Sequence, residues 1–486
     1  MHHNIRTAFL SAFTLLGAIT TFGQTDLPTD YLTPAFHASR REALRKAMPD
    51  NSVAVILAYP TRVFSNDVDY FYHANPDMYY FTGYKEPHSM LLVFKEPQKD
   101  STGNSFSEIL FVQKKDPAAE QWTGRRLGIE GVQNKLGIKT VMNGSAFKTF
   151  PINLASFDKI LMDVLPLDVP DSRPDKADLF DLITQLREKA AITETSLKEK
   201  KQDTREYAKI TGALREIKTP EELSLLRKAV EISCLGQNEV MKTVRPDMSE
   251  LEIQGLHEYV HKRYGAEGVG YGSIVGAGEN GCILHYEENS KTKIGNTLLL
   301  MDVGAEYHGY SADVTRTIPA KGKFSPEEKI IYQLVYDAQE AAFKTLKDGS
   351  TWNEAEKVSR DIVSDGLVKL GIAKDKADAR KYYPHGLGHH IGLDVHDRSN
   401  YGKLQKDMVI TIEPGIYIPE GSKCDKKWWS IAVRIEDDAL ITQDGYELLS
   451  AFAPRSIEAI EKMIAEKSVL DNYKLPPLKS SEKKGF

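Results

Sequence analysis

Two aspartates lie close together in the segment LLLMDVGAEYHGYSADVTRT, residues 298 to 317. Asp302 ends a run of three leucines and a methionine, and Asp313 follows eleven residues later. A carboxylate at the end of such an apolar run leaves water, which costs several kcal/mol unless a partner compensates it. If the segment is a hairpin with Tyr307 and His308 as its two-residue loop, Asp302 lies directly opposite Asp313, with Cβ atoms about 5 Å apart. Carboxylates held that close share a proton or a cation.

Two further acids follow strand-like runs. In MVITIEPGIYI the isoleucines alternate with polar positions, which places Glu413 on the face opposite the core. In SIAVRIEDD the same alternation places Arg434 and Glu436 together on the polar face. One such acid alone is typical of a solvent-facing strand end. Four of them, together with a histidine-rich loop, indicate a shared metal site.

The histidine-rich loop is HGLGHHIGLDVHD, which contains His385, His389, His390 and His396. Their spacing does not identify which of them binds metal. Carboxylates with one imidazole suit divalent Mn, Co, Fe or Zn better than copper or a thiolate site. Four carboxylates balance the charge of two divalent cations, and a two-metal centre can stabilise both oxygens of a hydrolytic transition state. The acids therefore predict a centre with two divalent metal ions.

The bulk composition narrows the class of protein. The chain has 486 residues, of which 41% are hydrophobic and 27% charged, values typical of a soluble globular protein with two domains. Its net charge of −6 gives no reason to expect nucleic acid as a partner. The three cysteines are too widely separated to form a disulfide framework.

Residues 1–23 have the pattern of a signal peptide. Arg6 lies in a short polar start, an apolar stretch follows from Ala8 to Phe22, and Gly23 precedes Gln24 at a plausible cleavage point. A membrane anchor is the alternative, but the stretch falls short of the ~20 apolar residues that a spanning helix needs. We therefore expect an exported protein, periplasmic or secreted, without stable membrane association.

The rest of the chain predicts two α/β domains and a tail. Short apolar runs of strand length, SVAVILAY, SMLLVFK, SEILFV and DKILMDV, indicate a mixed α/β domain over residues 34–205, ending in a charged helical connector. A second domain spans residues 206–460, and a Lys-rich tail covers 461–486.

The second domain contains an internal repeat. Thr219 and Ser249 each precede a glutamate by three residues, which is the spacing of a helix capping box, and the pattern recurs at Ser325 and Thr351. The offset between the two halves is 102 to 106 residues. Each helix pair precedes a Gly-rich segment with histidine and then an acidic strand, so we predict an internal αβ duplication.

Five motifs together resemble the aminopeptidase P and prolidase branch of the pita-bread metallopeptidases. They are GENGCILHY, MDVGAEYHGYSADVTRT, HGLGHHIGLDVHD, TIEPGIYI and VRIEDD, and they span roughly residues 219 to 450. The segment NDVDYFYHANPDMYYFTGYKEPHSMLLV is similar to the amino-terminal domain of the same branch. The resemblance implies a pita-bread catalytic domain with an internal pseudo-two-fold repeat.

The resemblance also implies roles for individual residues. Asp302 would chelate one ion, His389 and Glu413 would serve the other, and Asp313 and Glu436 would bridge the two. Manganese is the expected metal, with Zn²⁺, Co²⁺ or Fe²⁺ as alternatives. The remaining members of the implied site lie near the substrate or support the acids: His285, His385, His396 and Arg434. His390 has no implied role.

The implied function is removal of an amino-terminal residue that precedes proline. Glu413 would shuttle the proton, and His385 and His396 would hydrogen-bond the scissile carbonyl or its oxyanion, at about 3–4 kcal/mol for a good donor. Proline-containing peptides would be the partners, and a homodimer or homotetramer the assembly. Prolidase, a dipeptidase, shares every ligand and remains the main alternative. A creatinase-like enzyme or a non-catalytic peptide-binding protein would be expected to lack the ligands.

Two departures from the family pattern concern the pocket. Trp428 and Trp429 precede the VRIEDD motif where the family has glycines, so we expect bulk in the pocket wall. Arg398 follows the last histidine motif where the family has small residues, and it is a candidate clamp for a dipeptide's carboxylate.

The signal peptide can be tested on protein purified from the native host. We expect amino-terminal sequencing of the mature chain to begin near Gln24, because the apolar stretch of residues 8–22 is removed on export. Soluble and active protein that still begins at Met1 would contradict this prediction.

Overall fold

The computed structural model describes residues 28–472, apart from 101, 173–174, 176 and 193–201, and also residue 475. The chain divides into the units Met1–Tyr31 and Leu32–Phe486, and every element below belongs to the second. The predicted signal peptide and most of the predicted tail lie outside the described residues. Among the described helices, none has the length and apolar character that crossing a membrane requires.

A five-stranded mixed sheet forms the amino-terminal part of Leu32–Phe486. Its order is β6-β5-β4-β1-β7, with β1 antiparallel to β4 and parallel to β7. The strands are β1 Ser52–Leu57, β4 Met90–Lys99, β5 Ser105–Val112, β6 Val141–Asn143 and β7 Lys159–Met162, and a separate hairpin joins β2 Val63–Ser65 to β3 Val68–Asp69. The four predicted strands are confirmed, whereas β6 was not predicted.

Helices cover both faces of this sheet, so alternate residues of its strands enter different cores. Val53 and Val55 belong to one apolar cluster and Ala54 and Ile56 to another. The helices are α1 Pro34–Ala47, α2 Pro76–Thr82, α3 Pro117–Thr123, α4 Gly128–Leu136 and α5 Leu179–Ala190. Burial on both faces explains why β1 is an uninterrupted apolar run in the sequence.

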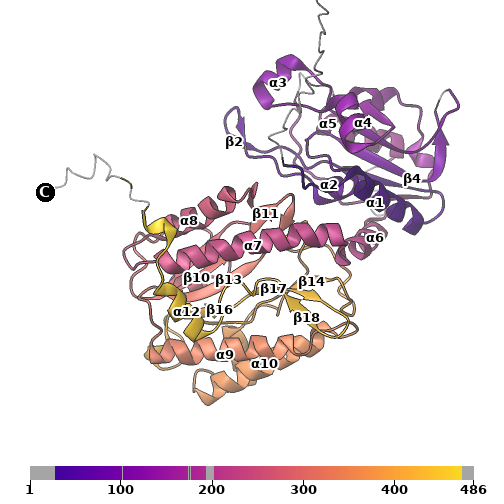
Figure 1. Ribbon diagram of the computed structural model, residues 1–486. Coiled ribbons are helices and arrows are strands. Elements are labelled where there is room, and N and C mark those ends of the chain that lie inside the picture. Colours follow the sequence, from indigo (N-terminus) through magenta and orange to yellow (C-terminus); the bar gives the residue numbers. More distant parts are fainter. Residues whose placement is uncertain are drawn as a thin grey trace, which may run out of the picture. The chain divides into compact units, whose positions relative to one another are not determined.

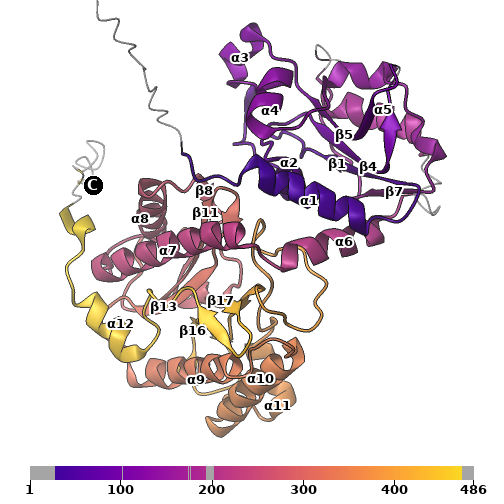
Figure 2. The same cartoon turned by 45° about the vertical axis from the view of Figure 1, so that its right-hand side comes forward.

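Helix α6, Thr204–Glu216, follows and lies beside α1 (Figure 2). The predicted helical connector falls partly on residues 193–201, outside the described part, so its continuity and the domain boundary near residue 205 stay predictions.

The remaining strands lie between two pairs of helices (Figure 1). On one side are α7 Pro220–Thr243 and α8 Glu250–Arg263, and on the other are α9 Pro326–Phe343 and α10 Trp352–Lys369. The strands form the groups β13-β10-β9, β12-β11-β8, β14-β17-β18 and β15-β16. The bounds of these strands are β8 Gly268–Val269, β9 Ile274–Ala277, β10 Leu298–Val303, β11 Ala305–Tyr307, β12 Tyr310–Ser311, β13 Val314–Pro319, β14 Val409–Ile412, β15 Gly415–Ile418, β16 Ile431–Arg434, β17 Asp437–Ile441 and β18 Tyr446–Leu448. Two further helices of this part of the chain are α11 Lys376–Ala379 and α12 Ile457–Ile464.

The predicted duplication is present in the contacts of the long helices. Thr219, Ser325 and Thr351 each form a complete capping box, and Ser249 caps α8 by accepting from the Glu252 backbone N–H. The repeat extends to a buried glutamine on α7 and another 102 residues later on α9, described next.

Each buried glutamine joins its helix to two strands of its own half. The Gln237 amide donates to the carbonyls of Met301 and Val314, at 3.1 and 2.8 Å. The Gln339 amide donates to the carbonyls of Ile412 and Ile435, at 2.9 and 3.0 Å. All four carbonyls belong to residues next to a predicted metal ligand: three directly precede Asp302, Glu413 and Glu436, and Val314 directly follows Asp313. Each amide therefore holds the acid-bearing strands of one half against a helix.

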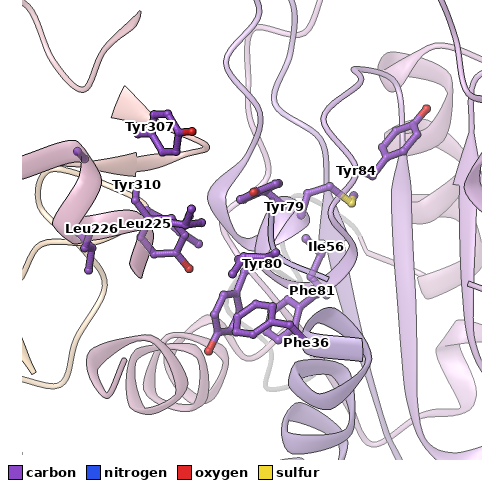
Figure 3. Packing of buried hydrophobic residues seen from close by; sticks show 14 of the residues in the cluster. Phe36, Ile56, Tyr79, Tyr80, Phe81, Tyr84, Leu225, Leu226, Tyr307 and Tyr310 are labelled. Atoms are coloured by element: carbon purple, nitrogen blue, oxygen red, sulfur yellow. The ribbon is translucent and has the colours of Figure 1, made fainter. Parts of the chain in front are cut away.

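One apolar cluster spans residues of the amino-terminal sheet domain and of the second domain. Phe36, Tyr80 and Phe81 belong to it from the first, and Leu225 and Tyr310 from the second (Figure 3). The Tyr80 hydroxyl also donates to the carbonyl of Leu214 on α6, at 2.7 Å. The two domains therefore share part of their core.

Candidate metal centre

The hairpin that carries the two aspartates has a different register from the predicted one. Asp302 pairs with Thr315, not with Asp313, and Tyr307 pairs with Tyr310, so the loop is His308-Gly309. Both loop residues have positive φ, 50° and 86°, as a type I′ turn requires, and glycine suits the second position. The predicted loop Tyr307-His308 was therefore wrong.

The error shifts the register by two residues and so leaves the aspartates on one face. Side chains alternate with period two along a strand, and an even shift preserves the face. The Tyr271 hydroxyl lies 2.5 Å from Asp302 Oδ1 and 2.7 Å from Asp313 Oδ1. Since one hydroxyl has one proton to donate, it satisfies one of the two carboxylates at a time. The other needs a proton or a cation.

Arg434 compensates the charge of Asp302. Its Nη2 donates to Asp302 Oδ2 at 2.6 Å, its Nη1 to the Tyr417 hydroxyl at 2.9 Å and its Nε to Thr315 Oγ1 at 3.2 Å. Burial would raise the pKa of Asp302, but Arg434 and the Tyr271 hydroxyl outweigh it and hold that pKa below its ordinary value.

The other three acids lack comparable cationic partners. Burial, followed by the neighbouring carboxylates, raises the pKa of Asp313 and of Glu436 well above the ordinary values. Burial also raises the pKa of Glu413 to about 7, even though His389 and Arg434 act in the opposite direction. Without added positive charge, the pocket would therefore hold protons on these groups.

His389 directs one ring nitrogen into this group of acids. Its Nε2 lies 3.5 Å from Asp313 Oδ2, 3.6 Å from Glu413 Oε1 and 4.0 Å from Glu436 Oε1. Its Nδ1 lies 3.1 Å from the His390 carbonyl, which can only accept, so Nδ1 is the donor and Nε2 is the nitrogen that faces the acids.

The donor set fits divalent cations. Single donor atoms of Asp313, His389 and Glu436 lie within 4.8 Å of one another, with all three residues buried. Carboxylates around an imidazole nitrogen are the ligands that a hard or borderline divalent ion prefers.

One pocket of about 500 Å³ contains the whole predicted site. It is lined by the nine predicted residues Asp302, Asp313, His389, Glu413, Glu436, His285, His385, His396 and Arg434. Tyr271, Glu287 and Tyr401 also line it and were not predicted. No motif marked them, and Tyr271 stands in a Gly-rich stretch that precedes β9.

A chain of hydrogen bonds orients His385. Because Arg434 donates to the Tyr417 oxygen, the Tyr417 hydroxyl donates its own proton to His385 Nε2, at 2.8 Å. His385 Nδ1 then carries a proton and donates to the Gly386 carbonyl, at 2.8 Å. Burial, followed by Arg434, lowers the pKa of His385 to about 3, which agrees with a neutral ring.

His396 and His390 lie on different sides of His389. The His396 ring contacts the His389 ring edge-on, with centroids 4.2 Å apart, and burial lowers its pKa. The His390 ring instead contacts Trp352 and Tyr401, at 5.5 and 5.2 Å between centroids. His390 contributes its carbonyl to the orientation of His389, and its ring does not line the pocket within the described residues.

The two tryptophans do not narrow the pocket. Trp428 is buried in the apolar core beneath β16, and the Trp429 indole N–H donates to the Ser422 carbonyl at 3.0 Å. Neither contributes to the pocket lining, so the expectation of bulk in its wall was wrong. The chain turns at Ser430, which has a φ of 58°, and this turn leads into β16.

Two family models match the chain. The model described as metallopeptidase family M24 matches residues 224–443, and the model described as aminopeptidase P, N-terminal domain, matches residues 37–159. The first match contains every predicted metal ligand.

Similar proteins extend over nearly the whole chain. The Xaa-Pro aminopeptidase of Escherichia coli (strain K12) is 35% identical over 444 residues, which cover 87% of this chain and 96% of that protein. Xaa-Pro aminopeptidase 3 of Homo sapiens is 31% identical over 88% of this chain and 84% of that protein. The structure of Pseudomonas aeruginosa aminopeptidase PepP matches with a TM-score of 0.78 and 31% identity, covering 90% of this chain and 99% of that one.

The metal site can be tested with Asp313→Asn. The substitution removes a charged donor from the centre of the acids, so we expect bound divalent metal to fall and peptidase activity to be lost. Because the buried Asp313 prefers its neutral form when no cation is present, the amide should not destabilise the metal-free fold. Metal analysis, activity and thermal unfolding measure these three effects, with Asp361→Asn as control, because Asp361 lies on α10 and does not line the pocket. Full activity in Asp313→Asn would contradict the shared site.

The orienting role of Tyr417 can be tested with Tyr417→Phe. The phenyl ring preserves packing but removes the hydroxyl that links Arg434 to His385. We expect a loss of activity of about 10- to 100-fold, as is typical for partners that orient site residues. Tyr446→Phe, on β18, is the control. Equal kinetics for both variants would show that the hydroxyl does not matter.

Proposed function

Because the chain belongs to metallopeptidase family M24 and carries the amino-terminal domain of aminopeptidase P, we propose that it releases the first residue from peptides whose second residue is proline. The observation that carries this proposal is the meeting of four acids and His389 in one pocket. The proteins named Xaa-Pro aminopeptidase match the chain across both domains, which supports this activity over that of a family member with the catalytic domain alone.

We further propose that the pocket holds two divalent metal ions, most simply Mn²⁺, with Zn²⁺, Co²⁺ or Fe²⁺ as alternatives. Asp302 would serve one ion, His389 and Glu413 the other, and Asp313 and Glu436 both. Such ions supply Lewis acidity for hydrolysis near neutral pH. Support comes from the four carboxylates that line the pocket: Asp302 is paired with Arg434, and the other three have raised pKa values.

The protein's own groups then have separate tasks. Glu413, whose Oε2 lies 3.6 Å from His385 Nδ1, is placed to hold and move a proton beside the scissile bond. His385 is bound to Gly386 and Tyr417, so its donor is already engaged. Among the described residues, no hydrogen bond holds the rings of His285 or His396, and we propose that these two histidines bind the substrate's carbonyl oxygens.

The position of Arg398 supports an aminopeptidase over a dipeptidase. Arg398 donates to Thr211 Oγ1 at 3.1 Å and to Asp163, and its guanidinium lies over the Tyr207 ring. It does not line the metal pocket, where Arg434 is the only lysine or arginine among the described lining residues, and Arg434 is bound to Asp302. A dipeptide's carboxylate would therefore find no unengaged lysine or arginine among these lining residues. The creatinase-like and binding-protein alternatives have less support, because they would be expected to lack these residues and all five line one pocket.

We propose, from the sequence pattern of residues 1–23, that the enzyme is exported to the periplasm or the medium. From the family resemblance we propose that it works as a dimer or tetramer.

The preferred peptide length tests the proposed function. We expect a tripeptide Xaa-Pro-Xaa to be cleaved at its first bond with a kcat/KM at least equal to that of the Xaa-Pro dipeptide, because the described pocket lining has no unengaged lysine or arginine to bind a dipeptide's carboxylate. Alanine in place of proline is the control substrate. A dipeptide preference above tenfold, or about 1.4 kcal/mol, would instead favour prolidase. Arg398→Ala should leave the ratio of the two substrates unchanged.

A further inference from the structure

We propose that Arg215 is a positioning residue for the reaction, and that it connects the amino-terminal domain to His396 in the metal pocket. The inference rests on the proposed function. Arg215 lies in the last turn of α6, is 3% exposed and does not line the pocket. Its effect would pass through Asp397, the residue that follows His396 in the chain.

Arg215 is shared between the two domains. Its Nη1 donates to Asp77 Oδ1 of α2, at 2.8 Å, and its Nε donates to Asp397 Oδ1 at 3.1 Å. Its Nη2 donates to Asp397 as well and lies 3.3 Å from Asp394 Oδ2. The planar guanidinium thus uses its three nitrogens on carboxylates from both sides, a geometry that an ammonium group cannot reproduce.

The amino-terminal side of this network is itself fixed. Asp77 is 3% exposed, and its Oδ2 accepts from the Tyr207 hydroxyl of α6 at 2.8 Å. Every residue of α2 is buried, so packing keeps Asp77 in its position even if Arg215 moves. The amino-terminal domain therefore provides a rigid anchor for the guanidinium.

Asp397 transmits this position to the histidine loop. Its backbone N–H donates to the His390 carbonyl at 2.8 Å, which closes the loop between the two histidine motifs. Its Oδ2 accepts from Lys218 Nζ at 3.0 Å. A Cβ on Gly392 would lie 2.2 Å from Asp397 Oδ2, so glycine is required there for the carboxylate to lie beneath the loop.

The network of Asp77, Arg215 and Asp397 reaches the metal pocket through His396. It precedes Asp397 directly, and its ring contacts the ring of the metal ligand candidate His389. Among the described residues no hydrogen bond to its own ring fixes His396, so its direction depends on the backbone that Asp397 holds. Movement of Asp397 would turn His396 while leaving Asp302 on β10 and the other three acids, which lie directly beside β13, β14 and β17, where they are. The same movement reaches His389 only if it also shifts the His390 carbonyl, which accepts from the Asp397 N–H and from His389 Nδ1.

Arg215→Lys tests the proposal, with a tripeptide Xaa-Pro-Xaa as substrate. We expect kcat to fall at least tenfold, with KM changed less than threefold, because the acids and His389 stay in place while His396 is misdirected. Bound metal should therefore be unchanged, and a loss of metal would show that the effect passes through the His390 carbonyl to His389 and would overturn the proposal. Arg41→Lys is the matched control, since Arg41 is an equally buried arginine, 3% exposed, that contacts Glu108 and the Phe81 carbonyl and not the loop. We expect its kcat to stay within twofold of the wild type.

A double-mutant cycle with His396→Ala separates positioning from general destabilisation. If Arg215 acts through His396, Arg215→Lys should cost less than twofold in kcat when His396 is already alanine. Equal losses in both backgrounds, or an unchanged kcat in Arg215→Lys, would overturn the proposal. Asp77→Asn, which keeps the shape of the anchor, replaces Arg215→Lys in the same cycle if the latter does not fold. A wild-type chain that leaves the tripeptide intact would contradict the proposed function instead.

Discussion

The mutual repulsion of four carboxylates held in one pocket is the constraint on which the rest of this structure depends. Asp302, Asp313, Glu413 and Glu436 converge in a pocket, and Arg434 neutralises the first of them alone. The arrangement is unfavourable for the bare protein, so the surrounding fold must impose it. Two helices bind the acidic strands through glutamine amides, and the metal ions we propose would supply the missing positive charge.

Much of this site could be predicted from the sequence because its signals are local. The acids follow apolar runs of strand length, so alternation alone placed Glu413 and Glu436 on polar faces, and all nine predicted site residues line one pocket. The predicted hairpin register was wrong, and the reason is local too. Gly309, the residue in the loop best suited to a positive φ, indicated the correct turn, and the even shift explains why the aspartates still share a face.

Other parts depend on contacts between distant residues and leave no local pattern. Tyr271 and Tyr417 orient site residues, but a tyrosine near a strand is ordinarily part of a core. Arg215 and Asp397 are 182 residues apart, and nothing in either segment predicts their contact. The assignment of His389 as the metal ligand also required the family resemblance, since four histidines crowd one loop and only the fold shows which ring nitrogen faces the acids.

Gln237 and Gln339 occupy equivalent positions in the two halves of the repeat, and this has a consequence for how such a site could arise. Each glutamine secures the strands of its own half, and each half supplies two of the four acids: Asp302 and Asp313 from the first, Glu413 and Glu436 from the second. An ancestor made of a single half would offer two carboxylates, enough charge for one divalent cation. To bind a second ion, such an ancestor would need a second copy of itself on the other side of the pocket. Fusing the copies frees each half to diverge, and here the one imidazole among the five predicted metal ligands, His389, belongs to the second half, while His285 of the first half lines the same pocket.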